Sequence, residues 1–192
     1  MLTLAHGAGA GMRHPFMEKL AAELANLGVA TLRYEFPYME QRRNRQDPPA
    51  VLHARVAEAA QAAREAAPDL PLFAGGKSFG GRMTSQAAAE GVLTDVHGIV
   101  FFGFPLHPPN RPGTSRADHL AKVAPPMLFL QGTRDEFAPL EELRPVCESL
   151  GANATLHVVD GADHGFHVLK RSGRNDDEVL RELAQTVASW TV

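Results

Sequence analysis

One serine stands between glycines at a spacing that serves nucleophilic chemistry. The segment Gly76-Lys77-Ser78-Phe79-Gly80 fits the pattern G-x-S-x-G, in which the serine occupies a sharp, strained turn between a strand and a helix. Both glycines are needed because a side chain there would collide with the neighbouring strand or helix. The turn exposes the serine oxygen and points the Phe79 N–H toward a developing oxyanion. Ser78 is therefore predicted to be a nucleophile, although a glycine-rich turn with no catalytic role has the same pattern.

A serine hydroxyl is a weak nucleophile at neutral pH. It needs a histidine to accept its proton and a carboxylate to orient that histidine. Ser78, Asp135 and His164 occur in the chain order nucleophile, acid, base that goes with this type of turn. His164 is favoured as the base because it comes directly after the last predicted strand. Other histidines fall within predicted helices or strands: His14, His53 and His157.

Nearby residues offer alternatives to this acid and base. Glu136 is the neighbouring candidate for the acid, and His167 is the rival base. His164 and His167, together with Asp160 and Asp163, also have the composition of a metal site. Short acidic clusters with histidine are usually polar loops, so neither a bound metal nor another cofactor is expected.

A second oxyanion donor is expected after the first predicted strand. The segment His6-Gly7-Ala8-Gly9 is similar to the His-Gly segment that supplies such an N–H group. Its glycines allow the backbone to turn in toward a substrate. The Ala8 N–H is the predicted partner of the Phe79 N–H, with Gly9 the next candidate.

These residues must be positioned by an alternation of strands and helices. Six short apolar runs bounded by Gly, Pro or Asp are typical of buried parallel strands: residues 2–5, 30–34, 72–74, 98–102, 127–131 and 155–159. Helices are predicted between and after them: residues 15–27, 48–67, 78–90, 139–150 and 176–190. This order predicts an α/β fold with a doubly wound, mostly parallel six-stranded sheet and helices on both faces. Residues 1–192 are expected to form a single domain, with the site at the carboxyl ends of the strands.

Several helix boundaries carry recognisable signals. Pro15 suits a first helical position, and Gly28 suits the position after the helix ends. Asp47 is expected to cap the second helix and Asn175 the last one. Pro145 inside the fourth predicted helix is expected to kink or shorten it.

The composition excludes several classes of protein. With 192 residues, 44% of them hydrophobic and 21% charged, the chain has the balance of a globular domain. A net charge of −3 is too even for a protein that coats nucleic acid. Cys147 is the single cysteine and cannot form an internal disulfide, which favours a reducing compartment. Without a long apolar span or a basic leader, the protein is expected to be cytoplasmic, with no membrane partner.

Motifs spread over the whole chain carry a family resemblance: HGAG at 6–9, LRYEFPY at 32–38, GKSFGGR at 76–82, FPLHP at 104–108, QGTRD at 131–135 and GADHGF at 161–166. They resemble the α/β-hydrolase superfamily on its dienelactone-hydrolase-like side. Within it they resemble the small hydrolase-like domain group that includes the testis-expressed proteins and a non-specific-lethal complex subunit. The resemblance implies a triad of Ser78, Asp135 and His164.

The chain also departs from these relatives. Dienelactone hydrolases carry a cysteine nucleophile, so Ser78 argues against dienelactone itself as the substrate. The superfamily usually places antiparallel strands before its His-Gly strand, whereas Met1 already stands at that strand. Some members of the group are non-enzymatic subunits, which keeps a binding module on a hydrolase scaffold as an alternative.

The predicted function is a serine hydrolase that cleaves small carboxylic esters or lactones through an acyl-enzyme. Large lids of the superfamily are usually inserted after the fourth predicted strand, where residues 104–124 stand here. Four prolines oppose a long helical cap there: Pro105, Pro108, Pro109 and Pro112. A loop and one short helix over residues 118–123 are expected instead, which leaves the site open and favours small acyl groups.

A nucleotide-binding protein is the remaining alternative. GKS at 76–78 copies the end of a P-loop, but Pro71 stands where that motif needs glycine. Met12 interrupts the dinucleotide-binding pattern, although Glu35 could still contact a ribose. A group of side chains near strand ends could favour an anionic substrate, but solvated surface charge is the expected account: Arg33, Lys77, Arg82, His107 and Arg111.

Overall fold

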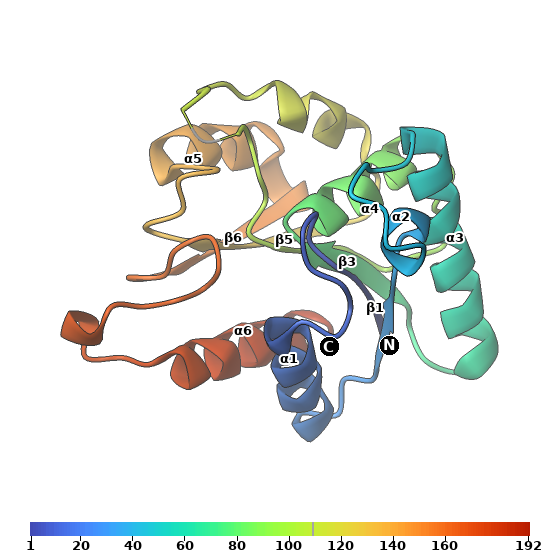
Figure 1. Ribbon diagram of the computed structural model, residues 1–192, viewed down its shortest axis with the longest axis horizontal. Helices are drawn as coiled ribbons and strands as arrows, with labels where there is room; N and C mark the ends of the chain where they lie inside the picture. Colours follow the sequence, from blue (N-terminus) through green and yellow to red (C-terminus); the bar gives the residue numbers. More distant parts are fainter. Residues whose placement is uncertain (109) are drawn as a thin grey trace.

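A sheet of six parallel strands organises the chain (Figure 1). The computed structural model describes residues 1–108 and 110–192. The strands are β1 (Leu2–Ala5), β2 (Thr31–Tyr34), β3 (Phe73–Lys77), β4 (Ile99–Phe102), β5 (Met127–Gly132) and β6 (Ala154–Val159). Their order is β2-β1-β3-β4-β5-β6, and each neighbouring pair is parallel. The predicted α/β fold with a doubly wound sheet is confirmed. Because the chain reverses its direction of travel between β1 and β3, the loops after these two strands flank the crevice where such sheets bind ligands.

Helices cover both faces of the sheet, as predicted. The α-helices are α1 (Pro15–Asn26), α2 (Pro37–Glu40), α3 (Pro49–Ala66), α4 (Phe79–Ala89), α5 (Leu140–Ser149) and α6 (Asp176–Trp190). Three short 3-10 helices complete the described elements: η1 (Ser115–Lys122), η2 (Gly151–Asn153) and η3 (Lys170–Ser172). Figure 1 shows α1 and α6 side by side on one face, with α3 and α4 on the other.

The two faces of the sheet have separate apolar cores. Helices α1 and α6 bury Leu20, Leu24 and Leu183 against the side chains of one face. Helices α3, α4 and α5 pack against a second cluster that contains several phenylalanines: Phe36, Phe79, Phe101, Phe104 and Phe129. Strand β3 is longer than predicted and continues through two glycines to Lys77. The added length carries the chain directly into the turn at Ser78.

The helix ends follow most of the expected signals. Pro15 occupies the first turn of α1, and Gly28 adopts the positive φ of +79° that suits the residue after a helix. Asn175 forms a capping box at the start of α6. The prediction for Asp47 is wrong, because its carboxylate pairs with Arg43 at 2.6 Å while Pro48 stands at the N-cap of α3.

Helices α5 and α2 differ from the sequence predictions. Helix α5 runs from Leu140 to Ser149 with Pro145 inside it, so this proline does not end the helix. The four-residue helix α2 begins at Pro37 and was not predicted.

Between β4 and β5 the expected short helix is present as η1, somewhat longer than residues 118–123. Pro109 lies outside the described residues, and among those described no helix has the length and apolarity of a bilayer span.

Candidate active site

Ser78 occupies a strained turn where β3 meets α4. Its φ and ψ are 50° and −113°, and it stands at the N-cap position of the helix. A Cβ added at Gly76 would lie 2.7 Å from the main-chain oxygen of Ala5, and one at Gly80 would lie 2.5 Å from that of His6. This confirms the prediction that a side chain at Gly76 or Gly80 would collide with a neighbouring strand. A larger residue at either position would push the turn away from β1.

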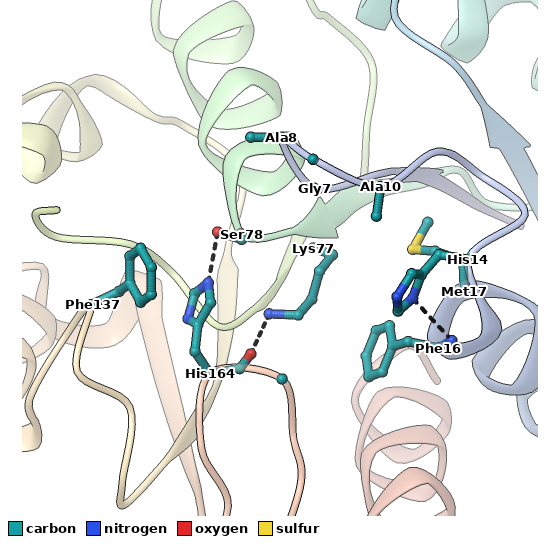
Figure 2. Close-up of a pocket in the computed structure, with 12 residues that line it drawn as sticks. Gly7, Ala8, Ala10, His14, Phe16, Met17, Lys77, Ser78, Phe137 and His164 are labelled. Carbon is teal, nitrogen blue, oxygen red and sulfur yellow. Dashed lines mark hydrogen bonds between the residues drawn. The ribbon is translucent and has the colours of Figure 1, made fainter. Parts of the chain in front are cut away.

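The side chain of His164 connects Ser78 to Asp135. His164 Nε2 lies 2.8 Å from Ser78 Oγ, and His164 Nδ1 lies 2.7 Å from Asp135 Oδ2. Because a carboxylate can only accept, Nδ1 carries the hydrogen and donates it, which leaves Nε2 to accept from the serine. Figure 2 shows the imidazole aimed at the Ser78 oxygen from the loop after β6.

Asp135 is held rigidly at the end of β5. Its side chain is only 1% exposed. Gln131 Nε2 donates to Asp135 Oδ2 at 2.6 Å, and the Phe137 N–H donates to Oδ1 at 2.8 Å. The ring of Phe137 then stacks on His164 with centroids 4.2 Å apart. Both oxygens of the acid and one face of the imidazole are thus fixed by neighbours.

The alternative acid and base lie elsewhere. Glu136 is exposed, unlike the buried Asp135. His167 is also exposed and pairs with Asp176, 2.9 Å away. Asp163 accepts the main-chain N–H groups of Gly165 and His167, so it shapes the loop. Within the described residues no group of three or more potential metal ligands gathers.

A second serine–histidine pair lies inside the protein. Ser85 Oγ is 2.7 Å from His119 Nε2, but Ser85 is fully buried on α4 and also donates to the Arg82 carbonyl at 3.0 Å. Burial, with a contribution from the nearby Arg82, lowers the pKa of His119 to about 4. Since its hydroxyl is already used and is shielded from any substrate, this pair lacks the features of a nucleophile and its base.

The loop after β1 is anchored through its carbonyl groups. His6 Nε2 accepts the Phe36 N–H at 3.1 Å, so Nδ1 donates to the Gly7 carbonyl at 2.7 Å. Burial raises the pKa of Tyr38 to about 12, and its protonated hydroxyl donates to the Ala8 carbonyl at 2.9 Å. In trans peptides the C=O and N–H point in opposite directions. The N–H groups that share a peptide with these two carbonyls, those of Ala8 and Gly9, therefore face away from His6 and Tyr38. Ala8 and Ser78 line the same cavity (Figure 2).

A cavity of about 310 Å³ opens next to Ser78 and His164. Its walls are mostly apolar and come from the β1 loop, α1 and the loop after β5: Ala8, Ala10, Phe16, Met17 and Phe137. His14, expected within a helix, stands at the N-cap of α1 and also lines this cavity. The volume is at the lower end of the range of about 300–1,000 Å³ for small-molecule sites.

Most of the side chains that were expected to be solvated at the surface are buried or half-buried. Lys77 is half-buried and lines the cavity, and His107 is buried beside Glu142. Two arginines are half-buried against the protein: Arg33 donates to the Met12 carbonyl, and Arg82 lies over the Phe79 ring. Arg111 is exposed as predicted.

Burial sets the ionisation of the groups in and near the site. It lowers the pKa of His164 more than the hydrogen bond to Asp135 raises it, and the positive charge of Lys77 lowers it further. A neutral imidazole at physiological pH is therefore favoured. Burial on helix α5 also raises the pKa of Cys147 to about 11.

Comparison with known proteins identifies the family. Residues 1–192 match the model of a protein family whose description is "Alpha/beta hydrolase domain". The chain belongs to the α/β-hydrolase family. An alpha-beta serine hydrolase homologue from Coxiella burnetii superposes on this α/β-hydrolase with a TM-score of 0.75 and 20% identity, over 97% of this chain and 85% of that one.

Two further structures share the fold of this α/β-hydrolase. A serine hydrolase without lid from Xanthomonas campestris gives a TM-score of 0.74 at 22% identity, covering 99% of this chain and 82% of the other. Dienelactone hydrolase from Anabaena variabilis gives 0.73 at 22% identity, covering 98% and 83%. The predicted resemblance to the α/β-hydrolase superfamily is confirmed by the family match, and these structures share its fold.

Several residues that shape the site were not singled out from the sequence. Gln131 and Tyr38 lie in segments that carried the family resemblance, but their hydrogen bonds to Asp135 and Ala8 depend on tertiary packing. Phe137 could have been suspected from its position two residues after the acid. Glu35, considered above as a ribose partner, instead accepts the Met12 N–H and anchors the loop before α1.

Proposed function

We propose that this α/β-hydrolase is a serine hydrolase that cleaves small carboxylic esters or lactones through an acyl-enzyme. The observation that carries the proposal is the continuous set of hydrogen bonds from Ser78 Oγ through His164 to Asp135 at the wall of an apolar cavity. A serine, a neutral imidazole and a buried carboxylate in this order are the parts that acyl transfer requires. Residues 1–192 would act as a single catalytic domain.

The first half of the reaction forms the acyl-enzyme. Ser78 Oγ attacks the carbonyl carbon while its proton passes to His164 Nε2, and the Asp135 carboxylate stabilises the resulting imidazolium. Negative charge develops on the carbonyl oxygen, where the N–H groups of Phe79 and Ala8 would receive it. The bond to the leaving oxygen then breaks, and His164 returns its proton to that oxygen. The products of this half are an alcohol and an ester of Ser78.

The second half returns the free enzyme. His164 Nε2 takes a proton from a water molecule, whose oxygen attacks the acyl carbon of the Ser78 ester. The same two N–H groups stabilise the second oxyanion. The bond to Ser78 Oγ breaks, His164 gives the proton back to Ser78, and a carboxylic acid leaves. With a lactone, the alcohol and the acid are two ends of one product.

The cavity supports small acyl groups. Its volume is about 310 Å³, and its walls are formed by the β1 loop, α1 and Phe137. The short helix η1 after β4 lies where other members of the superfamily usually insert a large lid. Each methylene beyond the cavity would stay in water and lose the roughly 0.8 kcal/mol that burial provides. Acetyl to butyryl esters and small lactones are the substrate class that fits.

Turnover of p-nitrophenyl acetate tests this proposal. Ser78→Ala should lower kcat/KM by on the order of 10⁴ or more, because the three residues act as a unit. Ser85→Ala is the matched control, since it removes the hydroxyl of the other serine that contacts a histidine. Normal turnover by the Ser78 variant would contradict the proposal. Absence of turnover in wild type with binding of an ester analogue would favour the non-catalytic alternative.

A further inference from the structure

The ammonium group of Lys77 lies in the proposed site, next to the main chain of His164. Its Nζ donates to the main-chain oxygen of His164, 87 positions along the chain. The ammonium also lies 5.2 Å from the ring centroid of Phe166 and 5.9 Å from that of Phe16. Figure 2 shows the Lys77 side chain extending from the end of β3 to the main-chain oxygen of His164. No step of the reaction outlined above uses this side chain.

An anion-binding role does not fit the charges around the lysine. Asp135 from the loop after β5 and Asp163 from the loop after β6 both lie close enough to act on its ionisation. These two carboxylates outnumber the single positive charge of Lys77. An anionic substrate at Lys77 would face them as well, so the surroundings supply no surplus of positive charge to attract it.

Close packing indicates that Lys77 and the imidazole form one unit. A Cβ added at Gly103 would lie 3.2 Å from Lys77 Nζ and 3.4 Å from each of Asp135 Oδ2 and His164 Nδ1. Lysine, acid and base therefore converge on the same glycine. His164 is held at Nδ1 by Asp135, on one ring face by Phe137 and at its main chain by Lys77.

We propose that Lys77 is a positioning residue for the hydrolysis, and this inference rests on the proposed function. Its ammonium holds the main chain of His164 so that Nε2 meets Ser78 Oγ, and its charge disfavours a second proton on the imidazole. The hydrogen bond acts on the geometry of the base, and the charge acts on its protonation. Both effects pass through His164, so the substrate need not touch the lysine.

The structure supplies the direction of each effect. The positive charge of Lys77 lowers the pKa of His164, which keeps the base neutral as pH falls. Burial lowers the pKa of Lys77 itself to about 8. The lysine is therefore charged throughout the range in which His164 titrates, and it loses its proton only after the imidazole is already neutral.

Variants of Lys77 separate this role from others. Lys77→Met keeps the length but removes the charge and the donor, whereas Lys77→Arg keeps both. In Lys77→Met, kcat should fall by roughly 10- to 100-fold, the scale of a misplaced base, with little change in KM for neutral esters. The acidic limb of the kcat/KM profile should move to higher pH in Lys77→Met and stay near wild type in Lys77→Arg. Lys122→Met removes an exposed lysine and is the control.

NMR titration of the His164 ring tests the same inference without turnover. In the wild type the ring signals should show their own titration and a second, smaller inflection near pH 8 from Lys77. Lys77→Met should raise the His164 pKa and abolish the second inflection. This measurement remains available if the variant folds poorly, because the wild-type ring reports the coupling directly.

Defined results would overturn the inference. One is a Lys77→Met variant with unchanged kcat, pH profile and His164 titration. Another is a loss confined to KM for carboxylate-bearing esters, which would make Lys77 an anion subsite. A wild-type ring with no inflection near pH 8 would also contradict it. Failure of the proposed function has a different signature: no turnover or labelling at Ser78, with the His164–Lys77 coupling still present in the NMR titration.

Discussion

Gly103 offers a test of how tightly the site is assembled. It follows β4, has a φ of +75° and leaves room for three side chains of the site. In Gly103→Ala the new methyl group would start 3.2 Å from Lys77 Nζ and 3.4 Å from Asp135 Oδ2 and His164 Nδ1. A contact of 3.2 Å is tighter than an ordinary one, whereas 3.4 Å is at the limit of ordinary contact. The Lys77 ammonium, which is hydrogen-bonded to the main chain of His164, must therefore shift by a few tenths of an ångström.

The magnitude follows from two separate effects. An alanine at this positive φ costs about 1–2 kcal/mol, which corresponds to a fall in Tm of roughly 2–8 °C for a chain of this length. A displacement of about 1 Å in an active site costs on the order of 10² in rate. The smaller shift here should lower kcat/KM for p-nitrophenyl acetate by roughly threefold to tenfold.

Gly173 provides a matched control. It has the same φ of +75°, but a Cβ there would meet nothing within 4 Å. Gly173→Ala should lose similar stability and keep full activity. Esterase kinetics on protein of verified folded fraction, together with thermal unfolding, separate the two effects. Equal activities in the two variants would refute the conclusion that packing at Gly103 positions the site.

Further predictions concern the acid, the oxyanion loop, the pH profile and the substrate. Asp135→Asn should lower kcat by roughly 10⁴ through the wrong histidine tautomer, while Glu136→Gln stays near wild type; the reverse pattern in ester assays would assign the acid to Glu136. Tyr38→Phe removes the donor to the Ala8 carbonyl, so kcat should fall more than KM rises, and unchanged kinetics would count against this anchor. The kcat/KM for p-nitrophenyl acetate should fall at low pH, where His164 becomes protonated. The midpoint of this fall should lie below the ordinary pKa of histidine because burial lowers the pKa of His164. A midpoint above the ordinary pKa would contradict the assignment of the base. Across p-nitrophenyl acetate, butyrate, octanoate and palmitate below their micelle concentrations, kcat/KM should peak at acetate or butyrate, and a steady rise toward palmitate would contradict the open, small-acyl site.

The fold and the glycine-flanked turn at Ser78 were predictable because their signals are local. Glycine at 76 and 80 is required by main-chain atoms of β1, so the pattern around Ser78 reports a steric need directly. Short apolar runs located all six strands: the four inner strands are almost fully buried, and the edge strands β2 and β6 are partly buried. The chain order of Asp135 and His164 then placed both at the edge that carries Ser78.

Features that depend on distant partners were not predictable. The direction of Lys77 is set by the His164 carbonyl 87 positions away, and nothing in the neighbouring sequence distinguishes it from a solvated lysine. Asp47 has the residue type of a helix cap, but Arg43 four positions earlier takes its carboxylate. Helix α2 is only four residues long, which is too short for an apolar period to reveal it.

Covalent labelling by a fluorophosphonate tests the central claim most directly. The reagent should form one adduct, and mass mapping should place it on Ser78, with labelling lost in Ser78→Ala and slowed in His164→Ala. Ser85, which also contacts a histidine, is an internal comparison within the same helix and should remain unmodified. An adduct on Ser85 or any other residue, or a protein that the reagent leaves unlabelled, would contradict the assignment of Ser78 as the nucleophile.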